Sequence, residues 1–161
     1  MIVSLVQILS SHGQAVVKDI RANLAATGTN ATGKTSNSIQ YEVTEQGSIT
    51  TLLVYGRPFV MTVETGRGPR RSSENQNVRQ RILEWMEAKG VGANMDQVKK
   101  EALANFLTWR INQEGTELHK KGGRKDIISN VVDQRLIDDI MSEVLSRFSN
   151  AYMDNVKTAI G

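Results

Sequence analysis

Hydrophobic residues near the start of the chain recur at helical spacing. From Ser4 to about Leu24 the apolar positions are mostly three or four residues apart, which predicts an amphipathic helix weakened in its middle by Gly13. The polar segment from Thr27 to Ser36 contains two glycines and has no apolar period. It therefore predicts a loop after the helix.

Alternation of apolar and polar residues replaces helical spacing between residues 39 and 64. A first run covers residues 39–43, Gln46-Gly47 supplies a turn, and residues 49–55 are rich in β-branched and bulky side chains. A third run places Phe59, Met61 and Val63 on one face and stops before the loop that carries Gly66, Gly68 and Pro69. Three neighbouring strands with short connections predict an antiparallel meander.

Helical spacing returns after this loop and continues to the end of the chain. Residues 78–89 and 98–111 predict two helices that pack as a hairpin, the second ending before Gly115. Apolar residues from about 126 to 160 keep helical spacing without proline or internal glycine. One helix of that length would span on the order of 50 Å. It is therefore expected to break at Ser129-Asn130 or Ser149-Asn150, or to project onto a neighbouring subunit.

Composition narrows the chemistry. A chain of 161 residues fits one domain, residues 1–161. Because the sequence has no cysteine, disulfides, thiol catalysis and thiolate metal sites are excluded, and two separated histidines argue against a metal site. The first residues lack a basic n-region, and no apolar stretch approaches the length of a membrane span, so a soluble protein made in a cytosol is expected.

Gly28 to Thr35 matches the phosphate-loop pattern G-x-x-x-x-G-K-[ST] at every defined position. In that motif backbone amides cradle phosphates, the position of Lys34 reaches the β and γ oxygens, and that of Thr35 holds magnesium. The motif requires a preceding strand and a following helix. Here a helical pattern precedes it, and a strand pattern starting near Ser38 follows. We interpret the match as a connecting loop and keep a small nucleotide-binding protein as an alternative.

Charged residues separate along the chain. A net charge of +3 is mild, so binding to nucleic acid would have to come from local clusters of basic residues. The basic clusters, which could face another subunit or DNA, are Arg67, Arg70 and Arg71 in the central loop and Lys120, Lys121, Arg124 and Lys125 in a second loop. The acidic residues that could meet them are Asp133, Asp138, Asp139 and Glu143. Such polarity suits a head-to-tail interface in a ring, although ordinary solvated charge and a DNA-binding module are the alternatives.

Residues of catalytic type are isolated from one another. His119 lies beside two lysines with no acid or nucleophile partner in the sequence, and Asp138-Asp139 point to different sides of a helix. Trp85, Phe106 and Trp109 lie among leucines at helical spacing, which favours core or interface packing over base stacking. The sequence therefore offers no catalytic residues.

Several short motifs follow one another in a set order along the chain. After the N-terminal helix come Thr32-Gly-Lys-Thr-Ser-Asn-Ser-Ile39 and then Val63-Glu-Thr-Gly-Arg-Gly-Pro69. Ile82-Leu-Glu-Trp85 with Lys89-Gly90 follows, and then Ala102 to Ile111 leading to Glu114-Gly-Thr116. This order resembles that of the tail-completion and head–tail connector (neck) proteins of tailed bacteriophages, and the resemblance covers about residues 1–116. The remainder departs from the family, because Leu118-His-Lys-Lys121 and a long helix replace the family's proline-rich segment.

The resemblance implies an α+β fold, in which an N-terminal helix packs on a small antiparallel sheet and a helical C-terminal half follows. It also implies a structural virion protein that forms a homo-oligomeric ring around the DNA channel, with no catalytic activity and no cofactor. The expected partners are further copies of the chain, portal, adaptor and tail proteins, and genomic DNA in the channel, with no membrane. The expected location is the virion neck, after assembly in the bacterial cytoplasm.

Overall fold

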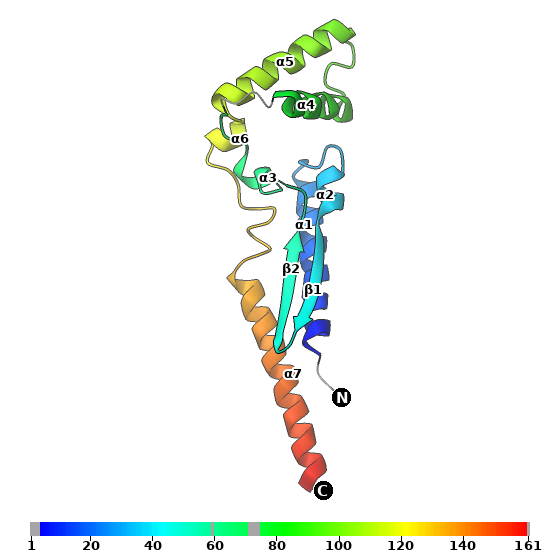
Figure 1. Ribbon diagram of the computed structural model, residues 1–161, viewed down its shortest axis with the longest axis vertical. Coiled ribbons are helices and arrows are strands. Elements are labelled where there is room, and N and C mark those ends of the chain that lie inside the picture. Colours follow the sequence, from blue (N-terminus) through cyan, green and yellow to red (C-terminus); the bar gives the residue numbers. More distant parts are fainter. Residues whose placement is uncertain (1–3, 59, 71–74, 161) are drawn as a thin grey trace.

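The structure, a computed structural model, describes residues 4–58, 60–70 and 75–160 as an elongated molecule (Figure 1). A helical hairpin forms one end, a helix packed on a small sheet forms the body, and the C-terminal helix extends past the body at the other end. In chain order the elements are α1 (Leu5–Ala26), α2 (Lys34–Ser38), β1 (Gln40–Gln46), β2 (Ile49–Tyr55), α3 (Thr62–Thr65), α4 (Asn75–Lys89), α5 (Gln97–Glu114), α6 (Glu117–Lys120) and α7 (Gln134–Ile160).

The α+β fold predicted from the sequence is confirmed. Strands β1 and β2 pair antiparallel, with Gln40 opposite Tyr55 at one end and Gln46 opposite Ile49 at the other. Helix α1 covers one face of this sheet, because alternate residues of each strand turn towards it. The other face is uncovered and exposes Ile49, Leu53 and Tyr55.

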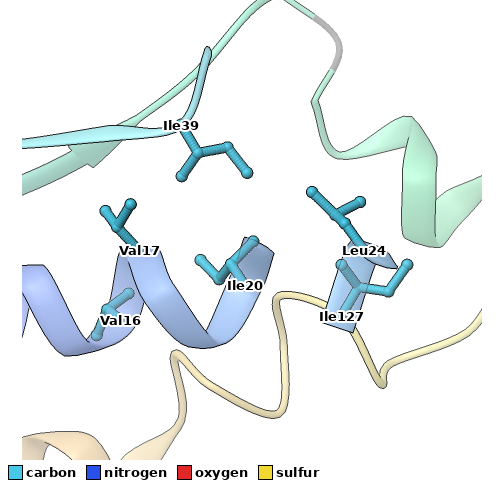
Figure 2. Close-up of a cluster of buried hydrophobic side chains, with 6 residues drawn as sticks. All are labelled: Val16, Val17, Ile20, Leu24, Ile39 and Ile127. Carbon is cyan, nitrogen blue, oxygen red and sulfur yellow. The ribbon is translucent and has the colours of Figure 1, made fainter. Parts of the chain in front are cut away.

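The principal core lies between α1, the sheet and the segment that leads into α7 (Figure 2). Val16, Val17, Ile20 and Leu24 of α1 are its centre, and Ile127 reaches it from a distant part of the sequence. Its fully buried members are Val16, Val17, Ile20, Leu24, Ile39 and Ile127. This cluster therefore joins the first and last quarters of the chain.

Gly13 strengthens the packing of α1 instead of weakening it. An added Cβ at this position would lie 2.5 Å from the Tyr41 ring and 2.8 Å from the Leu52 side chain. Glycine therefore lets the sheet approach the helix closely, which outweighs its low helix propensity.

The predicted third strand is wrong, and the sheet has two strands in the part of the chain that the structure describes. Phe59 lies outside the described residues, but the amides of Glu64 and Thr65 both bond to the carbonyl of Met61, and residues 62–65 form the helical turn α3. The alternation of Met61 and Val63 is overridden by tertiary contacts of Glu64, described below. Since a helix turn replaces the strand, the predicted meander reduces to one hairpin.

A second, smaller core holds the α4–α5 hairpin together, as predicted. Val78, Ile82 and Met86 of α4 pack against Ala104 of α5, and all four are buried. Asp96 caps α5 by accepting a hydrogen bond from the amide of Lys99 at 2.8 Å. The hairpin is thus an independently packed unit at one end of the molecule.

The C-terminal helix begins after Ser129-Asn130, one of the two places at which the sequence predicted a break. Residues 126–133 are irregular, and α7 starts at Gln134, where Asp133 accepts hydrogen bonds from the amides of Arg135 and Leu136. The helix passes through Ser149-Asn150 without a break. At 27 residues it is about 40 Å long, which explains why its end extends beyond the body (Figure 1).

Candidate functional site

The central loop is fastened by hydrogen bonds to the end of α5 and to Thr116, just after it. The amide of Arg70 donates to the Asn112 carbonyl at 2.9 Å, and the Arg67 guanidinium donates to Asn112 Oδ1 at 3.2 Å. The Thr116 amide donates to the Arg67 carbonyl at 2.8 Å, and the Arg67 amide donates to the Thr116 hydroxyl at 2.9 Å. Two motifs that carry the family resemblance, residues 63–69 and 114–116, therefore meet in space. We call this contact the junction.

Gly66 permits the close approach of the two segments at the junction. Its φ is +68°, and an added Cβ would collide with the backbone amide of His119 and lie 2.7 Å from the Thr116 hydroxyl. A side chain here is excluded twice, by backbone conformation and by space.

Glu64 completes the junction as a buried carboxylate that is 2% exposed. Its Oε1 accepts hydrogen bonds from three consecutive amides, those of Ile127 (2.9 Å), Ile128 (2.6 Å) and Ser129 (3.0 Å). Its Oε2 accepts from the Ser129 hydroxyl, and its own carbonyl accepts from the Arg124 amide at 2.8 Å. One residue thus ties the central loop to the segment that leads into α7.

Burial raises the pKa of Glu64, but the hydrogen bonds outweigh burial. The Ser129 hydroxyl and the three amides favour the ionised form, so the pKa lies below the ordinary value of 4.5. The carboxylate is therefore charged at neutral pH and fully satisfied. Its role is structural, because both carboxylate oxygens accept hydrogen bonds from the same chain.

The junction uses several of the basic residues predicted to face a partner. Arg67 bonds to Asn112, Lys120 pairs with Glu114 and Glu117, and the Arg124 guanidinium pairs with Asp126. Arg70, Lys121 and Lys125 are exposed and form no ion pair with the described residues. Arg71 lies outside the described residues. The two clusters are therefore less available than the sequence suggests, because internal carboxylates neutralise part of their charge.

The predicted acidic partners divide in the same way. Asp133 caps α7 and pairs with Arg135 at 2.7 Å, while Glu143 pairs with His12 of α1 at 2.9 Å and with Arg147. The His12 hydrogen bond lowers the pKa of Glu143. The exposed members are Asp138, which accepts from the Gln134 amide group, and Asp139. They remain available to a partner.

The outer face of α7 carries a row of uncovered apolar side chains. The row consists of Ile137, Met141, Leu145, Phe148 and Tyr152, each between 46% and 69% exposed. At 100° per residue the five fall within an arc of about 80°, and that arc contains no Asp, Glu, Lys or Arg. We call this row the α7 stripe. Side chains of this size in one row form a contiguous patch on the order of 500 Å², which is the size of the largest apolar patch on a typical monomer, a patch that is often functional.

The surface area of the whole chain is larger than that of a compact monomer of the same length. The chain exposes 11257 Å², whereas a compact monomer of the same length exposes about 8,000 Å². The excess follows from the elongated shape, the uncovered sheet face and the α7 stripe. Trp109 and Phe106 of α5 are also more than half exposed and lie 6.2 Å apart, so they are not core residues.

The phosphate-loop match runs from the loop after α1 into the five-residue helix α2, which begins at Lys34. A helix precedes Gly28 as predicted, but the expectation that the chain passes directly into a strand is wrong, since α2 comes first. Lys34 pairs with Glu84 of α4 at 2.7 Å. The match therefore lacks the preceding strand of a phosphate loop, and its lysine is held by a carboxylate.

His119 lies in α6, beside the junction glycines, and is exposed. Among the described residues no group of three His, Asp or Glu side chains is placed to hold a metal ion. Within the same residues, no helix is both long enough and apolar enough to cross a membrane.

Sequence reasoning missed Glu64 and the α7 stripe. Nothing local distinguishes Glu64, because its partners are 63 to 65 residues away in the chain. The stripe did leave a signal: the apolar positions of residues 136–152 occupy more of the helix circumference than one packed face requires.

A comparison of the chain with protein-family models, curated proteins and solved structures finds no match.

Proposed function

We propose that this chain is a structural subunit of the head–tail connector of a tailed bacteriophage, where it forms a ring around the DNA channel. The observation that carries the proposal is the α7 stripe: five large apolar side chains exposed on a helix that extends past its own body. Exposing such a row to water is unfavourable, and burial against another subunit removes that cost. A subunit built for assembly accounts for it.

Two further features support the proposal. The motifs that resemble the connector family converge at the junction, where hydrogen bonds and Gly66 join them. A buried carboxylate then orients the segment that leads into α7. The junction thus fixes the direction of α7, and in this proposal α7 contacts the next subunit.

Exposed basic and acidic residues on separate parts of the molecule favour head-to-tail assembly. Arg70, Lys121 and Lys125 near the junction and Asp138 and Asp139 on α7 are exposed and lie on different parts of the molecule. In a ring, the basic residues of one subunit can meet the acidic residues of the next, which gives a heterologous interface that closes on itself. Portal, adaptor and tail proteins are the neighbours that the resemblance implies above and below the ring.

The test is the presence and copy number of the chain in purified phage particles. Quantitative mass spectrometry is expected to find several copies per particle, and electron microscopy of particles labelled at the C-terminus is expected to place them at the neck. Absence from the particles would overturn the proposal. The solution mass of the isolated chain is a weaker test, because connector subunits can assemble only on their neighbours.

A further inference from the structure

A pocket of about 280 Å³ opens between three segments that are distant in sequence. Residues from 29–35, 57–58 and 60–63 and from helix α4 line it, and residues 29–35 belong to the match to the phosphate-loop pattern. Its charged lining residues are Lys34, Arg57, Arg81 and Glu84. Three cations against one carboxylate leave this pocket with an excess of positive charge.

The carboxylate of Glu84 neutralises only one of these cations. It pairs with Lys34, while the guanidinium groups of Arg57 and Arg81 form no ion pair with the described residues. Hydrogen bonding to Lys34 lowers the pKa of Glu84, with a smaller contribution from the charge of Arg57. A carboxylate is thus already stabilised at this position, and two guanidinium groups remain for an incoming anion.

Neutral groups of the lining also fit a phosphorylated ligand. Thr32 and Thr35 line the pocket and supply hydroxyl groups. Trp85 stands at the pocket and is 42% exposed, so part of its ring is free to stack. Arginine pairs, hydroxyls and an exposed indole together match a phosphate attached to a nucleoside.

We propose that this pocket binds a phosphate group carried by a nucleoside, either a free nucleotide or a unit of a nucleic-acid strand. Arg57 and Arg81 hold the phosphate oxygens, and Trp85 stacks on the base. Glu84 competes with the phosphate for Lys34. This site differs from a phosphate loop because it depends on guanidinium groups from outside the motif and needs no magnesium.

The test measures binding to the full chain at low ionic strength without magnesium. The probes are inorganic phosphate, ADP and a 20-nucleotide single-stranded DNA, and the readout is Trp85 fluorescence in the Trp109→Phe background together with calorimetry. Arg57→Ala/Arg81→Ala is expected to weaken binding by at least about tenfold. The control Arg79→Ala/Arg110→Ala removes the same charge from residues outside the pocket lining and is expected to leave the affinity within about twofold.

A second variant keeps the test decisive if the double arginine variant does not fold. Glu84→Gln removes the competing carboxylate and is expected to strengthen phosphate binding about three- to tenfold. Binding of ADP alone identifies a nucleotide site, and binding of DNA alone identifies a strand site. No binding of any probe at 5 mM, or equal losses in the two double variants, would overturn the proposal. Because the isolated chain is used, failure here leaves the connector proposal intact.

Discussion

The junction buries a charged group, whereas the α7 stripe exposes apolar side chains. At the junction a carboxylate is buried and every contact it needs comes from the same chain. Along the stripe, apolar side chains are exposed and the same chain supplies no cover. The chain thus supplies the hydrogen bonds of its buried carboxylate, but it does not cover the apolar side chains along its last helix. Stability should therefore depend on the first region and assembly on the second.

The largest expected effect is on the junction. Glu64→Ala leaves three amides and a hydroxyl without their acceptor, and we expect it to lower the free energy of unfolding by about 3–5 kcal/mol. Urea denaturation followed by circular dichroism measures it. The control Glu84→Ala removes a carboxylate from a solvated ion pair and should cost much less stability than Glu64→Ala. Equal losses in the two variants would show that the junction is not a special point of stability.

Gly66→Ala tests the close approach in the same region. We expect a loss of about 2–3 kcal/mol, because the new methyl group meets the His119 amide and the backbone has a positive φ. Gly90 has a similar φ of +67° with open space around it, so Gly90→Ala should cost only about 1 kcal/mol. The difference between the two melting temperatures isolates the steric part. No difference would mean that the two segments can separate without penalty.

One substitution at two places on α7 compares the inner and outer faces of that helix. Leu136 packs on the principal core, so Leu136→Ser should lower the free energy of unfolding by about 2 kcal/mol. Leu145→Ser, in the stripe, should change it by less than about 0.5 kcal/mol while reducing incorporation into particles. Thermal denaturation and particle counts measure the two consequences. If Leu145→Ser destabilised the isolated chain as much as Leu136→Ser, the stripe would belong to the fold and not to an interface.

The smallest expected effect is a dependence on pH. The folded-state pKa of Glu64 is lowered, so its contribution to stability is fully present above pH 4.5 and is lost as the pH falls through the lowered pKa. The wild type should be more stable than Glu64→Gln at pH 7, and this gap should narrow in acid. Urea midpoints of both proteins between pH 7 and pH 3 measure it. A gap that stays constant would contradict the role of the ionised carboxylate.

The spacing of apolar residues predicted those elements in which the buried side chains recur at the period of the element itself. Helix α1 and the α4–α5 hairpin were predicted because their apolar residues repeat at the spacing of the face that packs. The strand at residues 59–64 was wrong because Met61 and Val63 alternate, while the partners of Glu64 lie near residue 128 and impose a turn. A break at Ser129-Asn130 was one of the predicted alternatives, but the pattern did not show that the irregular segment covers residues 126–133. Its apolar spacing is helical, but its amides bond to Glu64.

The candidate sites show the same limit. Sequence alone placed the basic and acidic clusters, but pairing partners such as Asp126 for Arg124 and His12 for Glu143 depend on the fold. The pocket joins loop 29–35 to Arg57 and Arg81, which no motif connects. Long-range contacts of this kind leave no periodic trace. The α7 stripe, in contrast, follows from the positions of apolar residues within one helix, so the sequence alone could have predicted it.

Because the chain contains no cysteine, a single introduced thiol can report directly whether a neighbouring subunit covers the α7 stripe. Leu145→Cys places one thiol in the stripe, and Ser11→Cys places one on an exposed position of α1 as a control. In the free chain both thiols should react rapidly with a maleimide. In purified particles the thiol at position 145 should be protected at least about tenfold, because a neighbouring subunit covers the stripe. Equal reactivity at position 145 in the free chain and in particles would contradict the account.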